Sequence, residues 1–348
     1  LGEATHGNAE FQLERLGLVQ KLPQFKAIML EEDYGNTSLV DDFVQGGAGT
    51  AQDAARQFGF RINHTEQMAE LLQWLRDHNA GLPADQRIRL VGVDTQRTDA
   101  SKQIALDRLA EYDAPTAEQL GDQLAGWTDD SDAPDAASMR PVIGQLIAAI
   151  ETTPDTDGRA HALNASTALS QHLDLIDASD PEYFAVRAQI MATNVARTVD
   201  EERARGNEHS LLFAHNGHVD KASIAFGGLD LGSLLADEYG DGYRVIGTDL
   251  HHSTLLSGQG ADRWEVNLTN RTPLRGIFAG TNEGYLEFAT ASAESRKLLS
   301  HPVRMASAGE QFQQWQAWIP LFNSVKMTPN ASYDALILVE RATPVTPL

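Results

Sequence analysis

The chain has 348 residues, of which 42% are hydrophobic and 22% are charged, a composition typical of a folded globular protein. Its formal charge of −22, from 27 basic and 49 acidic side chains, argues against nucleic acid and anionic membranes as partners. The sequence contains no cysteine, which excludes a disulfide framework and a thiolate nucleophile.

Short apolar runs bounded by polar residues indicate strands that are covered on both faces, as in α/β proteins. Leu1 reads as the last residue of a strand whose beginning lies outside the sequence. The other expected strands end next to acidic residues or histidine, at Glu31, Asp94, His215, Asp249 and Glu340. All of them lie in residues 1–99 and 206–348, so we expect these two segments to form an α/β catalytic core with a mostly parallel sheet flanked by helices.

Amphipathic helices are predicted between the strands. Asn63 is the expected N-cap of the helix that follows it. Residues 100–205 contain no convincing strand but several helical patterns, one expected to begin at Pro141 and another at Asp180 and Pro181. We interpret this segment as a helical insertion that covers the active-site cleft and binds substrate.

Side chains capable of acid–base chemistry gather at the ends of the expected strands. Ligands of open α/β sheets bind outside the carboxyl ends of the strands, and the residues at that position are Glu3, His6, Glu31, Asp94, His215 and His218. The opening stretch LGEATHGNAEFQLER adds Glu10 and Arg15. Because the enrichment follows from where the strands end, it predicts a catalytic cleft at this edge of the sheet.

The residue types limit the reactions that such a cleft could catalyse. Carboxylates beside histidines suit general acid–base catalysis near neutral pH, and an arginine can stabilise an oxyanion or anchor an acidic substrate group. The sequence has no G-x-S-x-G elbow, Walker loop or G-x-G-x-x-G after a strand, which leaves water activated by a histidine as the simplest nucleophile. A metal-dependent hydrolase is an alternative, since the same side chains can bind Zn²⁺ or Mn²⁺. A non-catalytic binding role is another.

Six blocks of the sequence, in order, resemble the erythromycin esterase family: GEATHGNAEF followed by Arg15, then LEEDY, VGVDTQ, RAQIMATN, FAHNGHV and YRVIGTDL. The broader class of this family includes proteins once labelled as succinoglycan biosynthesis proteins. The blocks span nearly the whole chain, and G-E-x-x-H-G and A-H-N-x-H are the most specific of them. The resemblance implies hydrolysis of a macrolide lactone, without a metal or cofactor, by water that a histidine activates.

The resemblance also implies roles for individual residues. His6 would be the general base, Glu3 the carboxylate of the same block and Arg15 the active-site arginine. Glu31 matches the glutamate of the second strand better than Glu32 does.

The later blocks extend this set. His215 and His218 match the two histidines of the A-H-N-x-H block, and Arg187 and Asn194 match a helical block that lies against the cleft. We therefore expect a catalytic group made of His6, Glu3, Arg15, Glu31 and His215. We expect a second group, which binds substrate or supports the catalytic residues, made of His218, Asp94, Arg187, Asn194 and Glu10.

The segment GTDLHHSTLLSG departs from the family, because His251 and His252 stand where an aromatic or apolar residue and glycines are usual. The pattern places both histidines at an exposed turn. This departure, together with an insertion that matches the family at only one block, motivates an alternative function: cyclisation, dehydration or rearrangement of a natural product without net hydrolysis. For either function we expect a small polyketide-like substrate, no cofactor, a monomer or homodimer, and a cytoplasmic location without membrane attachment.

Overall fold

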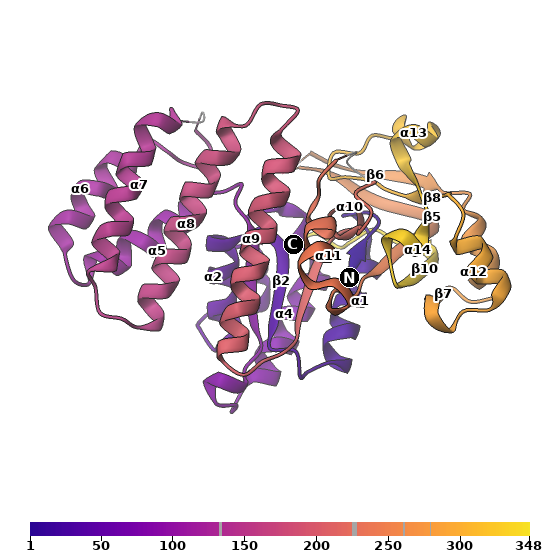
Figure 1. Cartoon of the computed structure of the whole chain (residues 1–348), viewed down its shortest axis with the longest axis horizontal. Helices are drawn as coiled ribbons and strands as arrows, with labels where there is room; N and C mark the ends of the chain where they lie inside the picture. Colours follow the sequence, from indigo (N-terminus) through magenta and orange to yellow (C-terminus); the bar gives the residue numbers. More distant parts are fainter. Residues whose placement is uncertain (132–133, 225–227, 260–261, 279) are drawn as a thin grey trace.

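The computed structural model (Figure 1) describes residues 1–131, 134–224, 228–259, 262–278 and 280–348. Its first sheet has four parallel strands in the order β1-β4-β2-β3, which are Gly2–Glu3, Ser210–His215, Ala27–Asp33 and Arg89–Asp94. The register pairs Glu3 with His215 and Leu30 with Phe213. The carboxyl ends of these strands therefore meet at one edge of the sheet, as the sequence predicts.

Helices cover both faces of this sheet, because successive side chains of a strand point to opposite faces. Ile28 and Leu30 of β2 pack with buried side chains of four helices: α1 (Ala9–Lys21), α2 (Tyr34–Val44), α3 (Ala51–Ala55) and α4 (Glu66–Asn79). Met29, which lies between them, packs on the other side with α9 (Tyr183–Ala204) and α11 (Leu231–Tyr239). A strand buried on both faces needs a continuous apolar run, and the stretch AIML supplies it.

A second sheet has the order β6-β5-β10-β7, with the strands Asp262–Thr269, Ile246–Gln259, Ala335–Ala342 and Glu283–Glu287. Its central strands, β5 and β10, are parallel, and the outer two are antiparallel to their neighbours. Strands β8 (Val303–Ala306) and β9 (Ser324–Met327) form a separate antiparallel pair. Asn216 links the two larger sheets, since its amide donates to the Thr248 carbonyl at 2.7 Å and accepts from the Thr248 N–H at 3.1 Å.

The described part of residues 100–205 contains helices joined by short turns and no strand. The helices α5 (Asp99–Ala110), α6 (Ala114–Leu124), α7 (Ala136–Glu151) and α8 (Asp157–Asp177) share a hydrophobic cluster of their own. Figure 1 shows this group to one side of the first sheet, where α5 and α8 contact α2 and α8 also contacts α9. The described residues also form the short α-helices α10 (Asn216–Val219), α12 (Ala293–Leu299), α13 (Pro320–Asn323) and α14 (Pro329–Ser332). Among the described helices, none has the length and apolar character needed to cross a bilayer.

Three helix starts differ from the prediction. Thr65, not Asn63, is the N-cap of α4, because its hydroxyl accepts the Met68 N–H at 3.1 Å. Pro141 lies inside α7, which begins five residues earlier at Ala136. Helix α9 begins at Tyr183, just after the predicted start at Asp180 and Pro181.

The prediction of an exposed turn at His251 and His252 is wrong. Strand β5 continues through both residues, because His252 is paired with Thr269 of β6 on one side and Arg341 of β10 on the other. His251 is buried. Pairing on both sides keeps this polar segment extended where its composition favours a turn.

Candidate active site

Glu3 joins His6 and Arg15 at the end of β1. Its Oε1 accepts a hydrogen bond from His6 Nδ1 at 2.6 Å, and its Oε2 accepts one from Arg15 Nη2 at 2.6 Å. His6 lies in the turn after β1, and Arg15 projects from α1. The side chains of Glu3 and Arg15 are 5% and 7% exposed and that of His6 is 14% exposed, so the histidine is the member nearest to solvent.

The charges in this group stabilise each other. Burial raises the pKa of the Glu3 carboxyl, but the Arg15 guanidinium and the His6 hydrogen bond outweigh it and hold the pKa below its ordinary value. Burial lowers the pKa of His6, but the hydrogen bond and negative charge of Glu3 outweigh burial and raise the pKa. Glu3 is therefore ionised at neutral pH, and it makes His6 a stronger base.

Glu31, at the carboxyl end of β2, is the centre of a second group. Its Oε1 lies 3.0 Å from Arg187 Nη2 and 3.1 Å from His218 Nε2, and its Oε2 accepts the His215 backbone N–H at 2.8 Å. Arg187 reaches across from α9 and also donates to Asp94 through Nε at 3.0 Å and Nη2 at 2.5 Å. Burial raises the pKa of Glu31, but His218 and Arg187 outweigh it and hold the pKa well below its ordinary value.

His215 stands between the two groups. Its ring centroid is 5.0 Å from that of His6. Its Nδ1 accepts the Gly217 N–H at 3.2 Å, so Nε2 carries the proton and donates to the Ala4 carbonyl at 3.3 Å. Burial and the neighbouring imidazoles of His6 and His218 lower the pKa of His215 to about 4. At neutral pH this residue is an uncharged donor.

The two adjacent glutamates of LEEDY point in opposite directions, as residues of a strand do. Glu31 faces the cluster, whereas Glu32 accepts hydrogen bonds from the Asn63 amide at 3.0 Å and from the Phe60 N–H. Of the two glutamates, Glu31 is therefore the one whose carboxylate reaches His215.

Two of the expected residues lie outside the cluster. Asn194 donates to the Val93 carbonyl at 2.9 Å and exchanges amide hydrogen bonds with Gln171, so it fastens α9 and α8 to β3. Glu10 accepts the Thr343 N–H and hydroxyl, so it holds the end of β10 beside α1. Neither has a recorded hydrogen bond with His6, His215 or Glu31.

A cavity of about 10 Å³ lies against His6, close to the smallest volume that holds one water molecule. Arg61, Arg263 and Glu310 contribute to its wall. The sequence analysis missed these three residues because they lie outside the strand ends and belong to no motif. A backbone bridge between Thr5 and Ala308 brings the segment of Glu310 to His6, and that pairing leaves no local signal in the sequence.

A larger cavity, of about 590 Å³, lies elsewhere. Its wall includes Ser210 and Ile246, the first residues of β4 and β5. It therefore borders the amino ends of these strands, opposite the edge that carries His6 and His215. None of the expected site residues lines it.

A model of the erythromycin esterase family matches residues 23–342 of the chain. A solved Bacillus cereus protein is similar to the whole chain, with 17% identity over 100% of this chain and 89% of that one and a TM-score of 0.82. A structure described as a succinoglycan biosynthesis protein is 14% identical over 99% and 88% of the two chains, with a TM-score of 0.82. A mutant of the erythromycin esterase EreC, in its open conformation, is 18% identical over 98% and 90%, with a TM-score of 0.62.

Proposed function

Because the chain belongs to the erythromycin esterase family, we propose that it hydrolyses an ester or macrolactone bond of a small molecule with water activated by His6. One observation carries this proposal. The Glu3 carboxylate holds His6 and Arg15 at 2.6 Å each, and His6 borders a cavity of about the size of one water molecule.

His6 has the geometry of a general base. Its Nδ1–H is committed to the ionised Glu3, which leaves Nε2 with the lone pair that accepts a proton from water. The charge of Glu3 stabilises the imidazolium that forms, as the carboxylate does in other His–carboxylate pairs. In this arrangement the hydroxide equivalent attacks the carbonyl carbon, and His6 returns the proton to the departing alkoxide.

Arg15 acts on the reaction through Glu3. Its guanidinium is buried, and besides Glu3 it contacts Asn63 at 3.4 Å and Met68 at 3.6 Å. A guanidinium held in this way orients the carboxylate and keeps it ionised. Arg15 is therefore a positioning residue in our proposal, whereas the sequence alone favours direct stabilisation of the oxyanion.

His215 is the donor best suited to the negative charge that develops on the carbonyl oxygen. It is neutral at pH 7, and its Nε2–H makes only a long contact of 3.3 Å with Ala4. A preformed donor of this kind, aimed at the transition-state oxyanion, contributes about 3 kcal/mol in other acyl-transfer enzymes. Arg61 and Arg263, which line the cavity beside His6 together with Glu310, supply positive charge at its wall.

The substrate needs more room than this conformation gives. Pockets for small organic ligands have volumes of about 300–1,000 Å³, far above the 10 Å³ beside His6. The wall has a simple point of opening, because Arg263 Nη2 donates to the Arg61 carbonyl at 2.8 Å across it. We propose that this contact separates when a macrocyclic ester enters.

The test is hydrolysis of a panel of macrolides and simple aryl esters, followed by mass spectrometry. With the wild-type protein, a macrolide substrate is expected to give a ring-opened product that is heavier by the mass of one water. His6→Ala should lower kcat by roughly 10²–10⁴-fold, the usual contribution of a general base, and the matched control His301→Ala, at an exposed position, should keep full activity. Near-normal turnover by His6→Ala would refute the assignment.

The same experiment separates the alternatives. A converted product of unchanged mass would indicate isomerisation or cyclisation by the same acid–base group. Loss of hydrolysis after chelation, with recovery on adding Zn²⁺, would indicate a metal-dependent hydrolase. We favour the metal-independent reaction because Glu3 and Glu31 each contact a buried guanidinium, that of Arg15 and that of Arg187, which solvent does not screen.

A further inference from the structure

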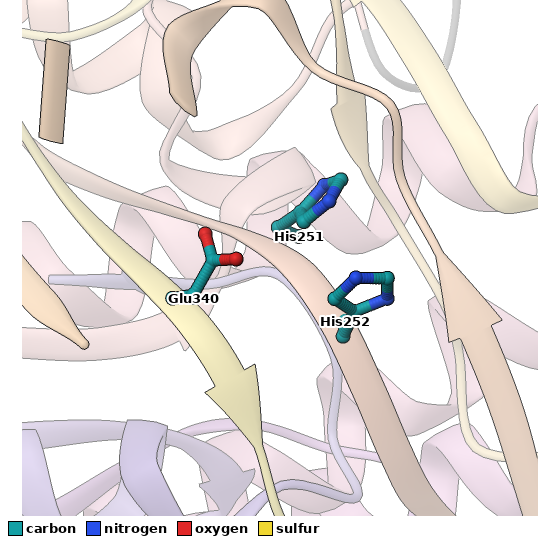
Figure 2. A group of neighbouring side chains, drawn as sticks. All are labelled: His251, His252 and Glu340. Atoms are coloured by element: carbon teal, nitrogen blue, oxygen red, sulfur yellow. The ribbon is translucent and has the colours of Figure 1, made fainter. Parts of the chain in front are cut away.

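The structure brings His251, His252 and Glu340 together on the second sheet, away from the strand ends that carry His6 and His215. Among the described residues, these three form a group in which one ligand atom from each lies within 4.8 Å of the others. Figure 2 shows the side chains beside one another, the two histidines on β5 and the glutamate on β10. We propose that this group binds a divalent transition-metal ion, with Zn²⁺ as its simplest occupant.

The backbone register creates the group. Leu250 is paired with Val339 and His252 with Arg341, so Glu340 stands beside His251 on the neighbouring parallel strand. Consecutive residues of a strand normally point to opposite faces, yet the rings of His251 and His252 have centroids only 4.1 Å apart. The two imidazoles therefore lean toward each other and toward the same carboxylate.

The hydrogen bonds of both rings are made at Nδ1, so a metal ion would bind at Nε2. His251 Nδ1 donates to the Asn270 carbonyl at 2.7 Å, which fixes the proton on Nδ1 and the lone pair on Nε2. Asn270 is itself held by its N–H, which donates to the His251 carbonyl at 2.9 Å. His252 Nδ1 lies 3.1 Å from the Thr269 hydroxyl, which can accept the same kind of hydrogen bond. Metal-bound histidines in proteins are oriented by such contacts at their second nitrogen.

Two imidazoles and one carboxylate are a ligand set that suits Zn²⁺ and related first-row ions. In a tetrahedral zinc site with bonds of about 2.1 Å, ligand atoms are separated by about 3.4 Å. The present separations, at most 4.8 Å, must therefore shrink by about 1.4 Å or less. His252 and Glu340 are partly exposed, so rotation of their side chains supplies this movement, and a fourth position stays open to water.

Arg275 is the charge that opposes a cation here. Its Nε and Nη2 donate to the two Glu340 oxygens at 2.8 and 2.5 Å. The Arg275 side chain is 53% exposed, so solvent screens this ion pair, although its bidentate geometry makes it stronger than an ordinary surface pair. A carboxylate also has more lone pairs than this pair occupies. The pair therefore tunes the affinity of the site and leaves it accessible.

The test is isothermal titration calorimetry of the chelator-treated protein with ZnCl₂. The wild-type chain is expected to bind one equivalent, and His252→Ala and Glu340→Gln should each weaken this binding by tenfold or more. Arg275→Ala should strengthen it, because a competing cation is removed. His301→Ala, which removes an exposed imidazole in the connection between α12 and β8, is the matched control and should bind like the wild type.

A second measurement guards against variants that fail to fold. In thermal unfolding followed by circular dichroism, Zn²⁺ should raise the Tm of the wild type and of Arg275→Ala, since a ligand that binds only the folded state stabilises it. It should leave the Tm of His252→Ala unchanged. Binding that survives both His252→Ala and Glu340→Gln, or that is lost in His6→Ala instead, would overturn the proposal and assign the ion to the His6 group.

Discussion

The Glu31 carboxylate accepts a hydrogen bond from the backbone N–H of His215 at 2.8 Å, across 184 positions of sequence. The carboxyl end of β2 thus fixes the first residue after the apolar run of β4. The same carboxylate contacts Arg187 of α9 and His218 of α10. Through Glu31, the elements β2, α9 and α10 are therefore all coupled to the position of the His215 imidazole.

We predict that Glu31→Gln destabilises the fold and impairs catalysis together. Removing one partner of a buried ion pair costs about 3–5 kcal/mol, and we expect roughly 2 kcal/mol because Arg187 keeps its contacts with Asp94. Urea unfolding measures this change. Glu111→Gln is the control, since Glu111 pairs with Arg108 while 58% exposed, and it should change stability by less than about 0.5 kcal/mol. Equal effects of the two substitutions would contradict the role of Glu31.

The meeting of Glu31 with His215 could be predicted from the sequence, because each of these two residues follows an apolar run that is too continuous for an exposed strand. Parallel strands then bring their ends together without further information. The choice of Glu31 over Glu32 rested on the resemblance to the family, because the alternation of a strand says only that the two side chains point to opposite faces. The structure has Glu31 on the side of His215. Local pattern and one rule of sheet topology therefore predicted the location, and the resemblance predicted which glutamate occupies it.

Other parts of the site depend on tertiary contacts that no local pattern encodes. Asn194 lies seven residues from Arg187 on α9, so both face the sheet, but the short amide stops at the Val93 carbonyl while the long guanidinium reaches Asp94. Glu310, one of the residues that wall the His6 cavity, arrives through the Thr5–Ala308 bridge. His251 and His252 look like a turn until pairing on both sides of β5 is known.

The pH dependence of catalysis tests the pairing of Glu3 with His6. Glu3 raises the pKa of His6 against the effect of burial, and the neutral imidazole is the active base, so activity should rise as pH increases through this raised pKa. In Glu3→Gln the charge is lost and burial remains. The acidic limb of the kcat profile should then move to lower pH, while kcat at its plateau falls by roughly 10²-fold or more, within the range a general base contributes.

A pH–rate series from about pH 5 to 9 measures both effects. The control is Glu70→Gln on α4, which is exposed and should leave the limb where it is. If the limb of Glu3→Gln stays in place while activity drops, the titrating group is not His6 and the assignment of the base fails.

The proposed role of His215 predicts a difference between two substitutions. His215 is a neutral N–H donor at pH 7, because its pKa is lowered to about 4. A glutamine amide can also donate at a similar distance from the backbone, whereas an alanine cannot. His215→Ala should therefore lower kcat by about 10²–10³-fold, as loss of one oxyanion donor does, and His215→Gln should recover at least tenfold of that loss. Equal activities would mean that the residue packs the site and donates nothing to the reaction.

The opening loop must approach β5 closely for His6 to be in place, and Gly7 makes this possible. The Leu256 N–H donates to the Gly7 carbonyl at 3.0 Å, and a Cβ added at Gly7 would lie 2.0 Å from the Leu256 carbonyl oxygen. Because that neighbour is backbone, Gly7→Ala must push the loop away from the strand. We expect a loss of about 1–3 kcal/mol of stability, as for other overpacked sites.

Catalysis should suffer more than stability, since His6 is the preceding residue and a displacement of about 1 Å can cost 10²-fold in rate. The control is Gly17→Ala on α1, where a Cβ would meet no atom within 4 Å. That substitution should stabilise the fold by about 0.5–1 kcal/mol, the usual gain for alanine over glycine in a helix, and leave kcat unchanged. Urea unfolding and steady-state kinetics on both variants measure these outcomes, and a Gly7→Ala protein with wild-type kcat would show that the position of His6 does not depend on this contact.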